Sequence, residues 1–143
     1  MTDAHDPFLH TLHAYAAAVL AKDVEAFVAL YDADVHIFDM WGDWSMRGIE
    51  PWRAMARDWF GSLGDERVVV EIDQAQAHVG EDMIVGHAFL RYTAYAASGE
   101  RLRSLDNRIT LGLARREGRW TIVHEHTSAP IEHSNVKAIL QRI

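Results

Sequence analysis

The sequence contains no cysteine, which removes several kinds of chemistry at once. Without thiols the chain can form no disulfide, no thiolate nucleophile and no zinc–thiolate site. Basic residues are also in deficit, because 14 Lys and Arg stand against 21 Asp and Glu and the net charge is −7. A domain this acidic lacks the basic surface that nucleic acids and anionic membranes require. We therefore expect neither kind of partner.

Long apolar runs are missing as well. The run from Ala14 to Ala21 is short and contains Tyr15, whereas a membrane-spanning helix needs about 20 apolar residues. The first residues include Asp3 and Asp6, where a signal peptide carries Lys or Arg. From these two observations we expect a cytoplasmic protein.

What the chain does contain is enough apolar material for one core. It has 143 residues, of which 49% are hydrophobic and 24% are charged. This length and composition are typical of a single globular domain. We expect one domain that covers residues 1–143, with no linker and no internal repeat.

The first half of the chain has helical patterns. Asp6 followed by Pro7 is typical of a helix start, and the apolar residues after it, Tyr15 included, recur at helical spacing. Asp23 is a capping residue for a short second helix. Pro51 opens a third, amphipathic helix, which ends near Gly61 and Gly64. Its large apolar residues are Trp52, Met55, Trp59, Phe60 and Leu63.

The second half has the pattern of a sheet. A short strand is predicted at 35–39, and longer strands at 66–79, 82–97, 101–116 and 119–129, joined by short polar connections. Such connections are typical of an antiparallel meander. Helices that come before strands, without βαβ alternation, indicate an α+β fold. We expect three helices to cover one face of a curved antiparallel sheet.

Alternation along the strands predicts which side chains face the helices. On the last strand it assigns one face to Trp120, Ile122, His124, His126 and Ser128, and the opposite face to Val123 and Glu125. On strand 101–116 it assigns Asn107 to the helix side, with Leu111. The two histidines would therefore lie on the wall of a pocket.

Strand 82–97 is apolar on both of its faces, with Ile84 and Leu90 on one and Val85 and Phe89 on the other. A strand of this kind has something packed on each side. Because helices can cover only one face, we expect a second copy of the chain on the outer sheet face, as a two-fold dimer.

Four ionisable residues are candidates for acid–base chemistry: Asp39, Tyr15, His124 and His126. Asp39 ends a strand among tryptophans, and desolvation by their rings would raise its pKa toward that of a neutral-pH base. Tyr15 would donate a hydrogen bond into the same space. Each residue has a structural alternative: a turn aspartate, a core tyrosine, or hydrogen-bonded core histidines.

Five residues are candidates for contact with a ligand. Aromatic rings that line a hollow bind flat apolar molecules, and polar side chains orient them. The candidates are Trp41, Trp52, Trp59, Asn107 and Ser128. The tryptophans of the third helix equally fit a plain hydrophobic core.

The His-x-His pair also has the spacing of two metal ligands on one strand. A third ligand would be required, and Asp39, His87 and Glu125 are the available choices. Two-residue spacing among nine histidines is a weak signal, so we assign no metal and no organic cofactor.

Several segments together resemble the SnoaL-like branch of the nuclear transport factor 2-like superfamily. They are Asp39 after a short strand, the tryptophan-rich third helix, Asn107-Arg108-Ile109-Thr110, Gly118-Arg119-Trp120 and the ending His124-Glu125-His126-Thr127-Ser128-Ala129-Pro130. The resemblance covers essentially the whole chain. It implies a cone of curved sheet (a cystatin-like fold) whose pocket is closed by three helices, in a protein that is usually dimeric.

The superfamily includes ketosteroid isomerase, whose pocket holds a tyrosine, an aspartate base and a second, protonated acid. Tyr15 and Asp39 resemble the first two. The stretch that would carry the second acid offers Asn107 and Asp106, and alternation points Asp106 outward. The match to a steroid isomerase is therefore incomplete.

Three functions follow from this resemblance, and fold alone does not choose among them. The first is a cofactor-independent isomerase, cyclase or dehydratase that acts on a small apolar or polyketide-like molecule. The second is a pocket protein that binds a metabolite without turnover. The third is a homo-association domain whose sheet surface is the functional part.

Overall fold

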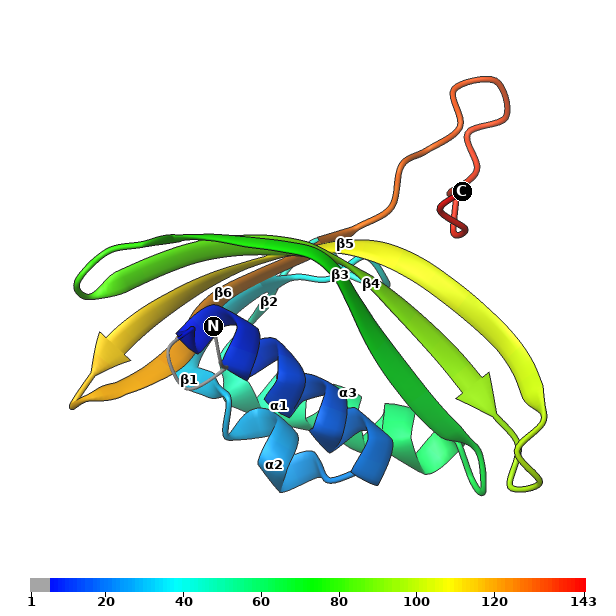
Figure 1. Cartoon of the computed structure of the whole chain (residues 1–143), viewed down its shortest axis with the longest axis horizontal. Coiled ribbons are helices and arrows are strands. Elements are labelled where there is room, and N and C mark those ends of the chain that lie inside the picture. The colour runs from blue at the N-terminus through cyan, green and yellow to red at the C-terminus, as the bar shows by residue number, and fades with distance from the viewer. Residues whose placement is uncertain (1–5) are drawn as a thin grey trace.

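Three helices lie against the concave face of one strongly curved sheet in the computed structural model, which describes residues 6–143 (Figure 1). The helices are α1 (Pro7–Ala21), α2 (Val24–Val28) and α3 (Ile49–Ser62). The strands are β1 (Tyr31–Phe38), β2 (Met46–Arg47), β3 (Arg67–Val79), β4 (Met83–Tyr95), β5 (Arg101–Arg116) and β6 (Arg119–Ser128). The α+β prediction is confirmed.

The helices begin where their capping residues stand. The Asp6 side chain accepts a hydrogen bond from the Leu9 backbone N–H at 3.0 Å, with Pro7 as the first helical residue. Asp23 caps α2 in the same way through the Ala26 N–H. Helix α3 begins at Ile49, two residues before the predicted start at Pro51.

The sheet is mixed rather than wholly antiparallel. Its strand order is β2-β1-β6-β5-β4-β3, and strands β3 to β6 form the predicted antiparallel meander. Strand β1, however, pairs with β6 in parallel, with His36 beside His124 and Phe38 beside His126. This parallel pair brings the end of β1, and with it Asp39, next to the C-terminal half of β6.

A bulge in β6 changes which residues face the helices. Leu113 pairs with Ile122, but the preceding residue, Gly112, pairs with His124, so Val123 is an extra residue in the ladder. One extra residue reverses the alternation beyond it. Ile122 and Glu125 are accordingly both buried under the helices. The prediction that His124 and His126 face the helices is wrong, because it assumed strict two-residue alternation along the whole strand and did not include the bulge.

The helices and the sheet enclose one hydrophobic core. Phe8, Leu12 and Val19 of α1 and Trp52 and Phe60 of α3 are buried there. Further members come from the concave sheet face: Val35, Ile37, Ile84, Leu90, Ile109, Leu111, Leu113 and Ile122. Tyr15 lies on the buried stripe of α1, as predicted.

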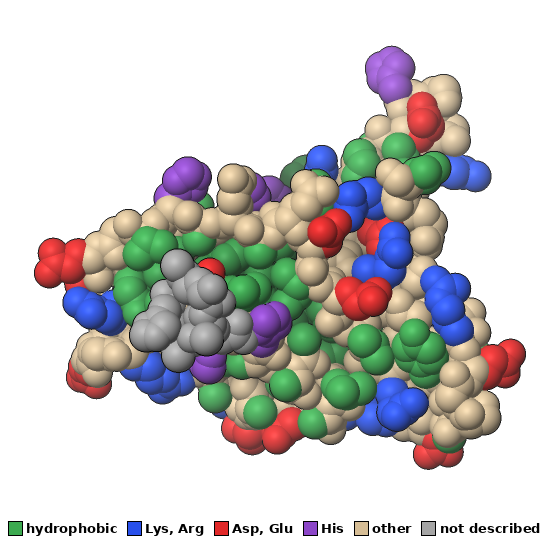
Figure 2. All heavy atoms as spheres, in the orientation of Figure 1, with side chains coloured by type: hydrophobic (Ala, Val, Ile, Leu, Met, Phe, Trp, Pro, Cys, Tyr) green, Lys and Arg blue, Asp and Glu red, His purple; other side chains and the backbone are tan. Residues whose placement is uncertain are grey.

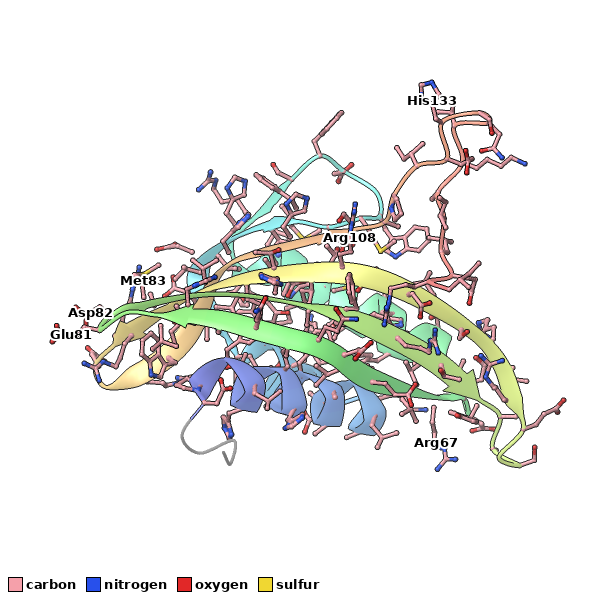
Figure 3. The ribbon with its side chains drawn as sticks, turned by 45° about the horizontal axis from the view of Figure 1, so that its top comes forward. Arg67, Glu81, Asp82, Met83, Arg108 and His133 are labelled. Carbon is pink, nitrogen blue, oxygen red and sulfur yellow. The ribbon has the colours of Figure 1, made fainter. Side chains whose placement is uncertain are left out.

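After β6 the chain leaves the sheet as an arm, residues 129–139, which projects from the body of the molecule (Figure 1). An isolated bridge between Ile131 and Ala138 closes the arm on itself, and Figure 3 shows His133 at its far end. Residues 140–142, which we call the latch, then return to β5. There the Asp106 backbone N–H donates to the Leu140 carbonyl at 2.8 Å.

None of the helices in the described part of the chain, residues 6–143, has the length and apolar character needed to cross a membrane. On the face seen in Figure 2, Lys and Arg side chains are interspersed with Asp and Glu rather than gathered into a basic patch.

Candidate functional site

A cavity of about 460 Å³ opens between the helices and the concave face of the sheet. Aromatic and apolar side chains make most of its wall: Trp41, Trp52, Met55, Trp59, Leu63, Val68, Tyr92, Ala94 and Leu105. Its size and its lining are those of a small-molecule site. All three tryptophans proposed from the sequence line it, Trp41 from the β1–β2 loop and Trp52 and Trp59 from α3.

Asp39 lies at one end of this cavity, held by a short hydrogen-bonded chain. The Met40 backbone N–H donates to Thr127 Oγ1 at 2.9 Å, and the Thr127 hydroxyl donates to Asp39 Oδ1 at 3.0 Å. Burial raises the pKa of the Asp39 carboxyl, while hydrogen bonds from Thr127 and from the backbone of Trp41 and Met40 oppose the rise. Asp39 therefore has both the orientation and the direction of pKa shift that suit a general base.

Glu125 is the second carboxyl of the cavity, and the sequence reasoning did not select it as a catalytic residue. It is 1% exposed and accepts a hydrogen bond from the Tyr31 hydroxyl at 2.6 Å. Burial raises its pKa from 4.5 to about 7, with a further rise from the nearby Asp39 charge and an opposing contribution from the Tyr31 hydrogen bond. Glu125 is thus poised to hold a proton near neutral pH in the same cavity as Asp39.

Tyrosine hydroxyls meet next to the two carboxyls. Tyr15 Oη and Tyr92 Oη lie 2.8 Å apart, and both side chains line the cavity. Burial raises the pKa of both phenols, and the negative charge of Glu125 raises both further. These hydroxyls therefore stay protonated at any physiological pH, and because one donates to the other, one proton of the pair is available for a ligand.

Two buried polar atoms of the cavity wall have no hydrogen-bond partner. Asn107 Oδ1 is one, although its amide nitrogen lies 3.6 Å from Met40 Sδ. The Trp52 indole N–H is the other: it influences the pKa of the nearby Tyr31 but does not reach that hydroxyl with hydrogen-bond geometry. Both residues line the cavity, but these two atoms are themselves buried away from its open space, so they do not mark a place for a ligand.

Three sequence candidates lie outside this cavity. His124 and His126 point to the outer sheet face, where the ring of Phe38 packs at 4.9 Å from the first and 5.5 Å from the second. Ser128 also lies outside, and its hydroxyl accepts a hydrogen bond from Arg108 Nε at 2.9 Å. Figure 3 shows Arg108 on the side of the sheet away from the helices.

The alternative of a metal site at His124 and His126 finds no support. Glu125 lines the inner cavity on the other side of the sheet, and although Asp39 and His126 both line a second hollow beside the β1–β2 loop, they are not joined there by a third ligand from the described residues. Within residues 6–143, no three His, Asp or Glu side chains come together as a group that could hold a metal ion.

One signal in the sequence could have identified Glu125. Without a bulge, β6 would bury the two imidazoles of His124 and His126 under the helices. With one bulge, it buries the single carboxyl of Glu125 there and turns both histidines outward. Glycine in a strand often accompanies a bulge, and Gly112 is the residue opposite the extra one. At Gly112 an added Cβ would lie 3.8 Å from both Val123 and His124, which share the outer side there.

The SnoaL-like domain model matches residues 9–132, most of the described chain and all of the site. The chain belongs to the SnoaL-like domain family. No curated protein matches the sequence.

Solved structures support the same fold. An NTF2-like protein of unknown function from Pseudomonas putida superposes with a TM-score of 0.83 at 24% identity, covering 100% of this chain and 99% of that one. Aln2 from a Streptomyces species gives 0.76 at 14% identity, over 90% and 91% of the two chains. A Xanthomonas campestris protein described as a candidate calcium/calmodulin dependent protein kinase II association domain gives 0.70 at 17%, over 88% and 87%. At these identities the likeness establishes the fold alone.

Proposed function

We propose that this protein binds a flat, apolar carbonyl compound in the inner cavity and moves a proton on it by acid–base catalysis. The observation that carries the proposal is the convergence of two carboxyls, Asp39 and Glu125, on a cavity with aromatic walls. Environments that push the pKa values of neighbouring acids apart are the usual basis for separate acid and base roles. Metal and organic cofactors have no part in the proposed reaction.

In the proposed reaction Asp39, ionised, removes a proton from the carbon next to the carbonyl. The electron pair of that C–H bond moves to the carbonyl oxygen and forms an enol or enolate. One proton of the Tyr15–Tyr92 pair lies between the two oxygens, and the other is donated to the carbonyl oxygen. This hydrogen bond and one from protonated Glu125 stabilise the developing negative charge. In a β,γ-unsaturated ketone, return of the proton from Asp39 to the γ-carbon completes an isomerisation as the double bond moves into conjugation. In a β-hydroxy ketone, the same proton passes to the β-hydroxyl, whose C–O bond breaks as the enolate re-forms the carbonyl and a C=C bond, so that water leaves.

The test uses 2-tetralone, a two-ring ketone with exchangeable protons beside its carbonyl. In D₂O, NMR follows replacement of these protons by deuterium, and we expect the protein to accelerate it above the rate in buffer. Asp39→Asn should lower the catalysed rate by a factor of about 10² or more, since a positioned base contributes about 10²–10⁴. Glu125→Gln should lower it less, and His126→Gln, on the outer face, should leave it unchanged.

The same experiment separates catalysis from binding alone. If 2-tetralone raises the melting temperature of the protein but exchanges no faster than in buffer, the pocket binds without turnover and the catalytic proposal is wrong. In that case Asp39→Asn should retain the affinity for the ketone.

We further propose that the outer sheet face binds a second copy of the chain. The ring cluster of Phe38 with the two outward histidines supports it, as does half-exposed Val85 on β4. Trp44 is 98% exposed and lines one hollow with Phe38 and His126. Apolar surface of this kind on a sheet is typical of a protein interface. Light scattering at micromolar concentration should give a dimer mass for the wild type and a monomer mass for Val85→Asp. A monomeric wild type would contradict the proposal.

A further inference from the structure

The cavity has a second polar end, at the opposite end from the acids. Among the described residues that line the cavity, Arg103 is the sole Lys or Arg. Along β5, alternation places Arg103 on the concave face with Leu105 and Asn107. Its neighbour across the ladder is Ala94 of β4, and the neighbour of Ala94 is Val68 of β3, so Arg103 lies over an apolar floor at the mouth.

The distance between the two ends follows from strand geometry. Arg103 and Asn107 are four residues apart on β5, and a strand rises about 3.3 Å per residue, so their backbones are about 13 Å apart. Asn107 marks the acid end, because its side chain reaches Met40, the residue next to Asp39. Between the two ends the wall is apolar and aromatic, with Trp59, Leu63 and Tyr92.

Among residues 6–143, the guanidinium of Arg103 has one charged partner, which a ligand can replace. Arg103 Nη2 lies 2.6 Å from Glu66 Oε1, and the side chains are 60% and 33% exposed. Exposed ion pairs of this kind contribute little to stability, about 0–1 kcal/mol. A planar carboxylate that enters the mouth can accept two parallel hydrogen bonds from a guanidinium, which is a stronger arrangement.

The loop that carries Glu66 is fixed by a second cation. Lys22, the residue that ends α1, donates through Nζ to the carbonyls of Gly64 at 2.7 Å and Glu66 at 2.9 Å. Lys22 thereby ties the α3–β3 loop to α1, and the ion pair of Arg103 spans the mouth from β5 to this loop. Arg103 is consequently held at the rim of the cavity.

We infer that Arg103 recognises an anionic substituent, most simply a carboxylate, on the far end of the ligand. This inference rests on the proposed function, since it names the class of molecule that the same cavity takes: a flat apolar body of about 13 Å with a carbonyl at the acid end and a carboxylate at the mouth. Arg103 determines specificity and does not touch the reacting atoms.

The test uses two probes that differ in charge and cannot react. Anthraquinone-2-carboxylate and anthraquinone-2-carboxamide share a flat body with ring carbonyls and have no exchangeable proton beside them. Isothermal titration of each at 0.1 M salt gives the ratio of the two dissociation constants. We expect the wild type to bind the carboxylate about five- to tenfold more tightly than the amide.

Three variants assign the preference to a residue. Arg103→Met should bring the ratio to about one and leave the affinity for the amide unchanged. Glu66→Gln, which releases the guanidinium, should tighten binding of the carboxylate alone. Arg101→Met is the matched control: its guanidinium donates to Ser104 Oγ instead of lining the cavity, and its loss should not change the ratio.

The outcomes separate this inference from the function on which it rests. A preference for the carboxylate that survives Arg103→Met, or a wild type that binds both probes equally, would overturn the anion site and leave the acid–base proposal standing. Failure of the wild type to bind either probe would overturn the assignment of the cavity to flat carbonyl compounds, and the anion site with it. Because neither probe can be turned over, a catalytically inactive pocket does not affect the result.

Discussion

The two faces of the same sheet differ in how they treat polar side chains. On the concave face, Glu125 and Thr127 of β6 are buried and hydrogen-bonded to Tyr31 and Asp39. On the outer face, half-buried His124 has its ring Nδ1 2.7 Å from the His36 carbonyl, and both His124 and the exposed His126 pack against the ring of Phe38. Neighbouring residues of β6 thus face opposite sides of the sheet. The bulge at Val123 determines which of them face the cavity and which face outward. The chemistry of this pocket depends on strand register as much as on residue type.

The difference between the two faces is tested most strongly by shortening one side chain on each face and measuring the loss of stability. Leu111, the partner of Glu125, is buried, whereas Thr110, the partner of His126, is exposed. Leu111→Ala should lower the free energy of unfolding by about 2–5 kcal/mol, and Thr110→Ala should change it by no more than about 0.5 kcal/mol. Urea denaturation measures both. Similar losses from the two variants would mean that the outer face is also buried in solution, as a dimer requires.

A second test uses pH and the raised pKa of Glu125. In the folded protein this carboxyl keeps its proton up to a pKa of about 7, against 4.5 as its ordinary value. Between these pH values the folded state binds more protons than the unfolded state, so stability falls as pH rises. By pH 8 the loss should be on the order of 3 kcal/mol.

Glu125→Gln removes this titration while keeping an acceptor for Tyr31. Its stability relative to wild type should therefore increase from pH 5 to pH 8, as measured by urea denaturation at each pH. Ser128→Ala, the control on the outer face, carries no titratable group and should show no such trend. A constant difference between Glu125→Gln and wild type would mean that Glu125 titrates normally.

The smallest expected effect concerns the hydroxyl that orients Asp39. Thr127→Val keeps the shape of the side chain but removes its hydrogen bond to Asp39, at a cost of about 1 kcal/mol in stability. Because that hydrogen bond lowers the pKa of Asp39, its loss should raise the pKa, seen by carbon-detected NMR titration of the carboxyl. Ser128→Ala on the outer face should leave the Asp39 titration unchanged; an equal shift in both variants would contradict the role of Thr127.

Much of the architecture could be predicted because it depends on local rules. Asp6-Pro7 and Asp23 are capping signals that act within one turn, and both helices begin there. The short polar connections predict the antiparallel neighbours of β3 to β6. The parallel pairing of β1 with β6 joins segments far apart in the chain, and no local pattern reports such a contact.

The site divides in the same way. Tyr15, Asp39 and Asn107 could be placed in one pocket because each lies on an element whose alternation or helical period is unbroken. Glu125 could not, because one extra residue at Val123 reverses the faces of β6. Arg103 was missed for a different reason: it stands at a strand end among Arg101 and Arg108, where charged residues are ordinarily solvated.

The latch has a consequence for solubility. Strand β6 ends opposite Arg108, so the earlier residues of β5 would present an unpaired backbone edge. Residues 140–142 cover it: Leu140 accepts from the Asp106 N–H, and Gln141 Nε2 donates to the Ser104 carbonyl at 2.6 Å. Open strand edges are templates for aggregation through strand addition. Residues 140–142 thus protect the β5 edge from pairing with a strand of another molecule. Removing these residues, or displacing them with an affinity tag, would expose that edge.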